Sequence, residues 1–495
     1  MEFKNYIDGR WVESATARRF DTLNPATGQP IGTAPDSDER DIDAAVAAAA
    51  HAYRPWRLTP APRRGEILYE IGRILRERKE DLSRFLTTEM GKVLPEARGD
   101  VQEAIDMAFY MAGEGRRLFG VTVPSELPNK FALAIRDSVG VVGVITPWNF
   151  PVAIPSWKVF PAIMAGNTVV FKPSGDTPGL ATKFVEALID AGLPPGVVNL
   201  VHGPGAAVGE ALVSHPQVKV VSFTGSTHVG RQVAERAGRL NKKVHLEMGG
   251  KNAIIVLDDA DLDLATEGIL WSAFGTSGQR CTAASRVIVQ RDVKDALTQR
   301  LVERASALRL GDGLLDTTDV GPIINQRQLT KIHSYTEIGR GEGAAVLTGG
   351  EVWANGGGFF YQPTIFDQVT PTMRVFQEEI FGPCTSLVSV DSFEEAIAAN
   401  NSVQYGLSSA LYTRDVNKAF QAIRDFDTGL VYINHGTIGA EIQLPFGGTK
   451  GTGNGHREAG IAGIDVFTEW KSVYIDYSGR LQRAQIDTDK LTGAN

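Results

Sequence analysis

The sequence predicts an α/β fold in which helices cover parallel β-sheets. From Val141 onward, short apolar runs such as VVGVIT, TVVFK and VKVVSF alternate with helical patterns, as in parallel sheets that are buried on both faces. The 53 glycines gather in short clusters between these runs, which is typical of α/β folds with tight ligand loops. The 495 residues also exceed what one hydrophobic core accommodates, and this length indicates roughly two to four domains.

Composition argues against several classes of protein. The net charge of −8 and the pI near 5.6 give no overall basic field, so nucleic acid is not expected as a partner. No apolar run approaches the ~18–20 residues of a membrane span, and the first residues lack the apolar core of a secretory signal. Because only two cysteines occur, we expect a reducing cytoplasm. The eight histidines show no metal-binding spacing, so no metal site is predicted.

The first 143 residues are expected to be mostly scaffold. Residues 1–36 carry Asn-Pro and Gly-Gln-Pro turns between polar strands, and residues 37–120 have helical periodicity. Residues 125–143 form an extended segment that stands apart from the helices on either side. Such a hairpin needs a pairing partner, and a second chain is one candidate.

The alternating region predicts where ligands bind. Helices are expected at 157–164 and 180–191 and from Ala206 and Val229, between strands that end with KVHLEM. In sheets of this kind, ligands bind at the carboxyl ends of the strands. A second α/β unit begins near 257–264 and runs to about Gly448. After it, the segment FTEWKSVYIDYSGRLQ alternates like an exposed strand before a polar tail.

The loop FGTSGQRCTAASR contains the first candidate for chemistry, Cys281. It follows Gly275 and Gly278, where the backbone can approach a ligand closely. A thiolate is a strong nucleophile, but it needs polar or electropositive surroundings to form at neutral pH, and Arg280 is a candidate for supplying them. The alternative is a small thiol buried in a core, and the loop alone does not decide between the two.

Two glycine loops and a lysine indicate a phosphate or ribose site. The loop FTGSTHVG follows a strand and opens a helix, so its backbone N–H groups and the hydroxyls of Thr224 and Ser226 suit a phosphate. It is neither a complete GxGxxG nor a Walker loop, and an ordinary strand-to-helix turn is the alternative. The loop HGPGAAVG is placed to wall the same pocket. Lys172 ends a strand, where it reaches ribose or phosphate oxygens or is simply a surface lysine.

Two further side chains have the chemistry of acyl transfer. Glu247 is followed by Met-Gly-Gly-Lys, and a carboxylate in an apolar, glycine-lined pocket has its pKa raised toward the range of a general base. The alternative is a capping or ion-paired glutamate. Asn149 lies between two prolines in TPWNFP, so its backbone is stiff and its side-chain amide suits an oxyanion donor. The alternative is an asparagine that only stabilises a turn.

Taken together, these motifs identify a family resemblance. TPWNFP, FKPS, FTGSTHVG, LEMGGKN, GQRC, EEIFGP and PFGGTKGTG occur in the order and approximate spacing of the NAD(P)-dependent aldehyde dehydrogenase superfamily. The resemblance extends from NYIDGRWVES to FTEWKSVY and therefore covers almost the whole chain. It implies that Cys281 attacks the aldehyde, that Asn149 and the Cys281 N–H hold the oxyanion, and that Glu247 activates the water that hydrolyses the thioester.

The resemblance also implies the cofactor, NAD or NADP, and the residues that bind it. Lys172, which we also count with the catalytic set, would hold the adenosine ribose, Glu379 the nicotinamide ribose, and Gly225 and Ser226 the pyrophosphate. The complete set that the resemblance implies is Thr146, Trp148, Lys172, Ser174, Gly205, Gly225, Ser226, Glu379 and Phe381. The second cysteine, Cys384, is interpreted as structural.

By the same resemblance, the chain divides into a Rossmann-type cofactor domain, an α/β catalytic domain and a small β oligomerisation domain. The expected ranges are 1–124 with 144–249, 250–450, and 125–143 with 468–495. A homodimer or homotetramer is the expected assembly.

One departure from the family pattern puts the cofactor preference in doubt. Many members that prefer NAD carry glutamate three residues after the lysine, where it binds the ribose hydroxyls. Here Gly175 occupies that position and Asp176 follows. Because the missing carboxylate would repel a 2′-phosphate, use of NADP becomes plausible. Met248, where leucine is commoner, is a volume-conserving change.

For the substrate, the contexts WNFPVAIPSWK, GQRCTAASRVIVQ and HREAG resemble bacterial 2,5-dioxovalerate (α-ketoglutarate semialdehyde) dehydrogenases. Trp157 replaces an arginine that is usual in succinate-semialdehyde members. An apolar mouth formed by Phe150, Trp157 and Phe446 would suit simple aliphatic or aromatic aldehydes equally well. Two other hypotheses stay open: an acylating enzyme in which CoA resolves the thioester, which Glu247 disfavours, and a scaffold protein that keeps the fold without turnover.

Overall fold

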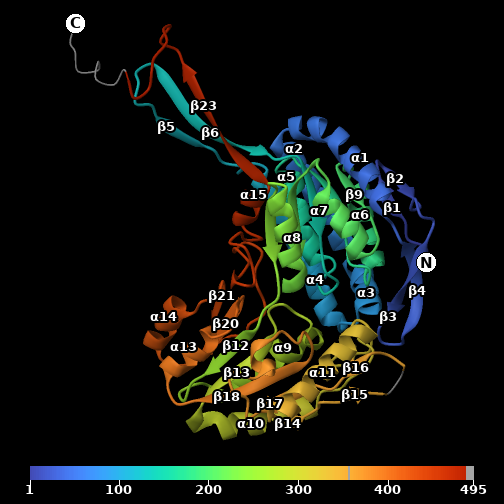
Figure 1. Cartoon of the computed structure of the whole chain (residues 1–495), viewed down its shortest axis with the longest axis vertical. Helices are drawn as coiled ribbons and strands as arrows, with labels where there is room; N and C mark the ends of the chain where they lie inside the picture. The colour runs from blue at the N-terminus through green and yellow to red at the C-terminus, as the bar shows by residue number, and fades with distance from the viewer. Residues whose placement is uncertain (355–356, 487–495) are drawn as a thin grey trace.

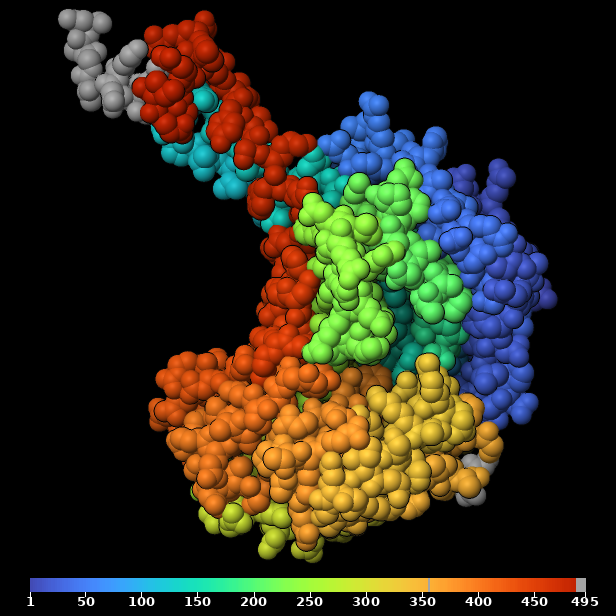
Figure 2. Space-filling model, viewed as in Figure 1, coloured from blue at the N-terminus to red at the C-terminus, as the bar shows by residue number. Residues whose placement is uncertain are grey.

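The computed structural model describes residues 1–354 and 357–486. Two seven-stranded sheets, each with its own helices, form the bulk of the molecule, and a three-stranded sheet projects from them as an arm (Figure 1). Figure 2 shows this arm standing clear of the second sheet unit, with an open hollow between them. The predicted α/β fold with parallel sheets is therefore confirmed.

The first sheet has the strand order β11-β10-β7-β8-β9-β1-β2. Its strands are β1 (Asn5–Ile7), β2 (Arg10–Val12), β7 (Val141–Ile145), β8 (Thr168–Lys172), β9 (Val198–Leu200), β10 (Val218–Thr224) and β11 (Lys243–Glu247). Strands β7 to β11 are parallel, whereas β1 and β2 form an antiparallel edge. Both faces are covered, and every residue of β7 and β8 is buried, which explains why β7 is apolar throughout and β8 is apolar at its three central positions.

The helices of this unit are α1 (Glu39–Leu58), α2 (Ala61–Glu77), α3 (Lys79–Met90), α4 (Leu94–Glu114), α5 (Ala153–Met164), α6 (Pro178–Asp190), α7 (Glu210–Ser214) and α8 (Thr227–Arg239). A π-helical turn, η1 (Gly205–Gly209), precedes α7, and a separate hairpin pairs β3 (Arg19–Asn24) with β4 (Gln29–Pro35). Helix α5 begins four residues before the predicted start at Trp157. Pro155 is tolerated there because the N–H groups of the first turn have no partner within the helix.

The second sheet has the order β14-β17-β18-β13-β12-β20-β21. These strands are β12 (Asn252–Val256), β13 (Ala284–Gln290), β14 (Ala345–Thr348), β17 (Thr364–Asp367), β18 (Cys384–Val390), β20 (Ser408–Tyr412) and β21 (Leu430–Ile433). All but the edge strand β14 run parallel. Small antiparallel pairs join β15 (Val352–Trp353) to β16 (Phe360–Tyr361), and β19 (Tyr405–Gly406) to β22 (Thr449–Lys450).

The remaining helices are α9 (Leu262–Phe274), the 3₁₀ turn η2 (Gly275–Gly278), α10 (Arg291–Ser306), α11 (Gln326–Glu342), α12 (Arg374–Gln377), α13 (Phe393–Asn401), α14 (Val416–Asp425) and α15 (Ala462–Val466). Cys281 follows helix α9 and turn η2 in the chain and lies just before β13. The cysteine loop therefore belongs to the second sheet unit.

The arm consists of β5 (Val121–Pro124), β6 (Lys130–Ser138) and β23 (Thr468–Asp476). Strand β6 lies in the middle, and β23 pairs with its full length, so the hairpin finds its partner within the same chain. Two expected boundaries change: β5 belongs to the arm although 1–124 was assigned to the first unit, and β7 belongs to the first sheet although 125–143 was assigned to the arm. Residues 487–495 of the expected tail lie outside the described residues.

Two features are absent from the part of the chain that the structure describes: a membrane-spanning helix and a cluster of metal ligands. Within residues 1–354 and 357–486, no helix is both long enough and apolar enough to cross a membrane. In the same ranges, no group of three or more His, Cys, Asp and Glu side chains is arranged to hold a metal ion. Both cysteines carry free thiols.

Candidate active site

The carboxyl ends of three neighbouring strands bring three of the predicted loops together. In the parallel ladder, Thr224 at the end of β10 lies across from Glu247 at the end of β11, and Phe223 lies across from Ile145 at the end of β7. The loops TPWNFP, FTGST and MGGK therefore leave the same edge of the first sheet. The cysteine loop of the second unit meets them there.

A cavity of about 130 Å³ lies where these loops meet. It is lined by Pro147, Trp148, Asn149, Ile154, Thr224, Gly225, Ser226, Met248, Gly249, Cys281, Gln328, Lys331, Glu379 and Phe381. The Trp148 and Phe381 rings pack edge to face, with centroids 5.5 Å apart. Residues from both sheet units thus surround one small space that contains the candidate nucleophile.

Asn149 is held beside the cysteine by a backbone contact. Its side chain is buried, and Nδ2 donates to the carbonyl oxygen of Gln279 at 3.0 Å, two residues before Cys281. An amide nitrogen carries two N–H groups, so one remains for a substrate oxygen. A fixed N–H group next to a nucleophile is the arrangement that stabilises an oxyanion.

The surroundings of Cys281 favour the thiol over the thiolate. Burial, together with the nearby negative charges of Glu247 and Glu379, raises the pKa of Cys281 to about 12. The hypothesis that Arg280 supplies an electropositive setting is wrong. Its Nη2 pairs with Glu96 at 3.2 Å and its Nε donates to Thr276 Oγ1 at 3.0 Å, so its charge is already engaged. The nucleophile must therefore lose its proton during the reaction.

In the cofactor-free protein, the rate at which iodoacetamide alkylates Cys281 is expected to rise about tenfold per pH unit between about pH 7 and 10. The reason is that the fraction of thiolate rises about tenfold per pH unit below the pKa of the thiol. Mass spectrometry of the Cys281 peptide measures the rate. Cys384 is the internal control, since it is buried and its pKa is also raised to about 12. A rate that levels off near pH 8 would contradict this expectation.

Glu247 lies next to the cavity in a deeply buried position. Both carboxyl oxygens lack a hydrogen-bond partner, and a Cβ at Gly447 would lie 2.5 Å from Oε1, so only glycine leaves room there. Burial raises the pKa of Glu247 well above its ordinary value, and the charge of Glu458 raises it further. The predicted direction of this shift is therefore confirmed. Such a carboxyl group is a strong base once it loses its proton.

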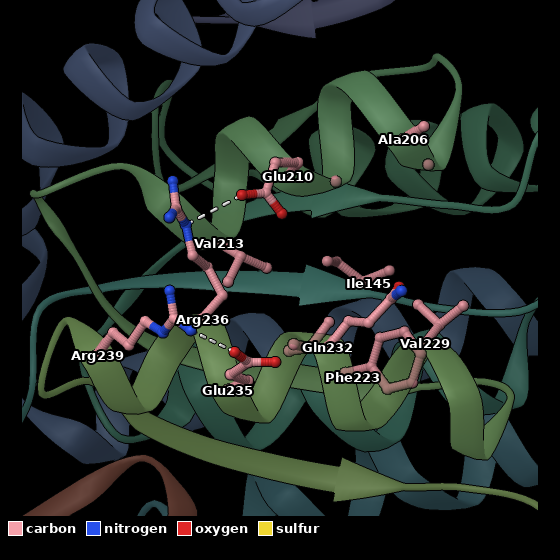
Figure 3. Close-up of a pocket in the computed structure, with 13 residues that line it drawn as sticks. Ile145, Ala206, Glu210, Val213, Phe223, Val229, Gln232, Glu235, Arg236 and Arg239 are labelled. Atoms are coloured by element: carbon pink, nitrogen blue, oxygen red, sulfur yellow. Dashed lines mark hydrogen bonds and ion pairs between the residues drawn. The ribbon is translucent and has the colours of Figure 1, made fainter.

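A second cavity of about 620 Å³ lies between the η1–α7 segment and α8 (Figure 3). Ile145, Val213 and Phe223 give it an apolar surface, and Gly205 lies in its wall. The ion pairs Glu210–Arg236 and Glu235–Arg239 lie along its rim, at 3.0 and 2.5 Å. This cavity suits a flat, largely apolar ring system that also carries polar groups.

The first turn of α8 separates the two cavities. Thr224, Gly225 and Ser226 line the small cavity, whereas Val229, one turn later, lines the large one. Ser226 caps the helix by accepting from Val229 N at 3.4 Å. Thr224 Oγ1 is buried without a partner, which leaves a donor for a ligand oxygen beside the helix N-terminus.

These features fit a dinucleotide such as NAD or NADP. The large cavity would hold the adenine end, the start of α8 the pyrophosphate, and the small cavity the nicotinamide end. Glu379 accepts from Gly250 N at 3.0 Å while lining the small cavity, where its carboxylate would be available to a ribose hydroxyl. When bound, the nicotinamide ring supplies a hydride acceptor.

Comparisons with known proteins agree with this geometry. The model of the aldehyde dehydrogenase family matches residues 11–473. The chain belongs to this family. It is 43% identical to the alpha-ketoglutaric semialdehyde dehydrogenase of Bacillus subtilis over 96% of this chain and 98% of that protein. It is 42% identical to the alpha-ketoglutarate semialdehyde dehydrogenase of Haloferax volcanii, with coverage of 96% and 99%.

Solved structures confirm the fold of this aldehyde dehydrogenase family member. An NAD-dependent aldehyde dehydrogenase from Sinorhizobium meliloti superposes with a TM-score of 0.95 at 37% identity, covering 98% of this chain and 96% of that one. The resemblance inferred from the motifs is therefore confirmed, and the chain is an NAD(P)-dependent aldehyde oxidoreductase.

The structure gathers most, but not all, of the predicted site residues. Trp148, Asn149, Gly225, Ser226, Cys281, Glu379 and Phe381 share the small cavity, and Gly205 lines the large one. Thr146, Lys172, Ser174 and Glu247 line neither cavity, although Met248, the residue after Glu247, lines the small one. The Lys172 Nζ is buried and donates to Pro173 O at 2.9 Å, and burial lowers its pKa to about 8. The catalytic role of Lys172 remains a prediction.

Several residues of the site escaped the sequence interpretation. Gln328 and Lys331 reach the small cavity from α11, and Gln328 Oε1 is buried without a partner. Lys158 on α5 forms a buried ion pair with Glu458, behind Glu247. The sequence did contain a sign of the Lys158–Glu458 pair, namely a lysine within an apolar helix. A fully buried lysine needs a counter-charge. Helix α11 gave no such signal, since its polar residues have the pattern of an exposed face.

The expected apolar mouth is only partly present. Trp157 and Phe446 pack edge to face with centroids 5.0 Å apart, and both are buried. The Phe150 ring, however, makes cation–π contacts: Lys92 Nζ lies 3.6 Å and the Arg280 guanidinium 5.1 Å from its centre. The sequence did not predict these cations because they come from distant parts of the chain.

Proposed function

We propose that this chain oxidises 2,5-dioxovalerate (α-ketoglutarate semialdehyde) to the dicarboxylate with NAD or NADP through a thioester on Cys281. The observation that carries the chemistry is the small cavity, in which Asn149 is fixed beside Cys281 and next to the start of α8. The proposed substrate is supported by the two relatives that carry this activity in their names.

The proposed roles combine the family resemblance with this geometry. The Cys281 sulfur attacks the aldehyde carbon as its proton passes to water, and the oxygen becomes an oxyanion held by Asn149 Nδ2–H and the Cys281 N–H. Loss of hydride from the tetrahedral carbon leaves a thioester. Glu247 then takes a proton from water, the water oxygen bonds to the thioester carbon, and the carbon–sulfur bond breaks to release the acid. Glu247 favours hydrolysis over transfer to CoA.

Initial rates with a panel of aldehydes test this proposal. The panel contains 2,5-dioxovalerate, succinate semialdehyde, propanal and benzaldehyde, each with NAD and with NADP and without CoA. We expect the highest kcat/KM with 2,5-dioxovalerate. A lead for propanal or benzaldehyde would contradict the substrate, and turnover only after addition of CoA would contradict the hydrolytic role of Glu247.

The change Gly175→Glu is expected to lower kcat/KM with NADP by about tenfold or more relative to NAD, because a carboxylate there repels a 2′-phosphate. The position has room, since a Cβ at Gly175 meets only the Phe20 ring at 3.6 Å. Rates with both cofactors measure the effect. Gly175→Gln is the matched uncharged control and should change the ratio much less. An equal loss with both cofactors in the glutamate variant would contradict the charge argument.

We also propose that the arm mediates a homodimer or homotetramer. Its strands expose large apolar side chains, among them Val123, Phe131, Trp470 and Tyr474, which a monomer would leave in water. Deletion of 471–495 removes most of β23 and is expected to lower the assembly mass measured by light scattering. An unchanged mass would contradict this role of the arm.

We propose a reducing, cytoplasmic location for the protein. Cys281 and Cys384 both carry free thiols, and the first must stay reduced to attack an aldehyde. Activity is expected to fall on oxidation with hydrogen peroxide and to be protected by bound aldehyde, which a rate assay after peroxide treatment measures. Full resistance to peroxide would contradict the need for a reduced thiol.

A further inference from the structure

A buried histidine faces the catalytic glutamate on the same strand. His245 and Glu247 are two residues apart on β11, so their side chains point to the same face of the sheet. His245 Nε2 lies 3.5 Å from Glu247 Oε1. His245 is only 1% exposed, and neither its Nε2 nor either Glu247 carboxyl oxygen has a hydrogen-bond partner. Two unsatisfied buried groups therefore face each other.

The other ring nitrogen of His245 is engaged. Nδ1 lies 3.2 Å from Ser222 Oγ and 3.5 Å from Glu458 Oε1. Because a carboxylate only accepts hydrogen bonds, Glu458 favours a proton on Nδ1 and leaves the lone pair of Nε2 directed at Glu247. Lys158 donates to Ser222 Oγ at 3.2 Å and pairs with Glu458, which fixes these acceptors in place.

The charges around the pair favour a single proton shared between its members. Burial raises the pKa of Glu247 and lowers that of His245, so a neutral carboxyl group faces a neutral imidazole at rest. The titratable and charged groups that face His245 are Glu247, Glu458, Lys158, His456 and Arg457. Burial, Lys158 and Arg457 oppose protonation of His245, as His456 does when it is charged. Glu247 and Glu458, each 3.5 Å from a ring nitrogen, would stabilise an imidazolium once they are ionised.

We propose that His245 takes the proton of Glu247 and thereby makes Glu247 the ionised base that deacylates the enzyme. This inference rests on the proposed function of Glu247. In the transfer, the O–H bond of Glu247 breaks and an Nε2–H bond forms, which leaves an imidazolium between two carboxylates. Water then gives its proton to Glu247 as its oxygen bonds to the thioester carbon, and loss of one proton to solvent resets the pair. His245 touches neither substrate nor cofactor, so it is a positioning residue.

Two substitutions separate proton transfer from polar packing. His245→Gln keeps a hydrogen-bonding group of similar size but cannot take up a proton, whereas His245→Leu removes both properties. If His245 takes the proton, both variants deacylate slowly. We expect kcat to fall by about tenfold or more, with KM for the aldehyde falling in proportion and kcat/KM preserved, because the acylation steps that set kcat/KM come first.

Rapid mixing gives the second readout. Both variants are expected to show a burst of NADH approaching one per active site, followed by slow turnover. The matched control is His215→Gln, because His215 Nε2 also lies 3.5 Å from a carboxylate, that of Asp43, on the surface of the first unit. This control should retain wild-type kcat and burst. A thermal unfolding scan of each variant verifies that it is folded, and His245→Asn replaces any variant that is not.

The outcomes separate this inference from the proposed function. If His245→Gln keeps the wild-type kcat, whether or not His245→Leu loses kcat, the proton transfer is overturned. The role of His245 is then polar packing alone. A loss of kcat/KM in His245→Gln would also overturn it, since the lesion would then precede deacylation. Glu247→Gln is run in parallel. If that variant turns over normally, the proposed role of Glu247 fails; if it is inactive while His245→Gln is normal, only the role of His245 fails.

Discussion

Cys281→Ala is expected to lower the rate of aldehyde oxidation by about four orders of magnitude or more, because no other side chain that lines the small cavity is a thiol and the thioester needs one. The cavity otherwise stays intact, so binding of NAD or NADP, measured by fluorescence titration, should be retained. Loss of cofactor binding together with activity would point to a folding defect. Residual turnover above about one per cent would contradict a covalent mechanism through this sulfur.

Cys384→Ala is the matched control for this experiment. Cys384 is the other cysteine of the chain, and it is buried at the start of β18, in a different hydrophobic cluster from the site. Its replacement is expected to preserve kcat and to lower the free energy of unfolding by about 1 kcal/mol, as for the loss of a small buried group. Equal losses of activity in both cysteine variants would contradict the assignment of the nucleophile.

Glu247→Gln is expected to lower the steady-state kcat by about 10²–10⁴-fold while a burst of NADH remains, because acylation and hydride loss precede the step that needs the base. Gln is close to Glu in shape, so the packing against Gly447 is preserved. Rapid-mixing absorbance measures the burst, and the steady-state slope gives kcat. The absence of a burst would show that Glu247 acts before hydride transfer.

The pH dependence of the wild-type enzyme has a defined sign. The pKa of Glu247 is raised in the folded protein, mainly by burial, so Glu247 holds its proton at rest below that raised pKa and is ionised above it without transfer to His245. The deacylation rate should therefore rise with pH through this pKa and fall below it. In Glu247→Gln this rise should disappear, since the amide does not titrate.

The motifs made the chemistry of the small cavity predictable from the sequence. A strand that ends in a glycine loop places N–H groups at a helix start wherever the pattern occurs, and this holds for FTGSTHVG and α8. The alternation of apolar runs with helices likewise predicted the first sheet, because strands buried on both faces are mostly apolar rather than alternating. These features depend on neighbours within about ten residues, so the sequence carries them directly.

The direction in which long side chains point was not predictable in the same way. Arg280 precedes Cys281 in the chain but turns to Glu96, 184 residues away, and Asn149 takes its position from Gln279, 130 residues away. Gln328 and Lys331 enter the cavity only because α11 packs against its rim. A local pattern does not specify such contacts, since they depend on how separate elements pack.

The sequence by itself determined the fold class and the loops at the strand ends, and it predicted the nucleophile and the oxyanion donor, because each follows from local backbone chemistry or from a motif with fixed spacing. Only the tertiary structure decided which charges surround these groups. It placed Glu247 beside His245 and near the buried Lys158–Glu458 ion pair. It also paired the arm hairpin with β23. The pKa of a buried group is set by desolvation and by charges a few ångströms away, and both exist only after the chain has folded.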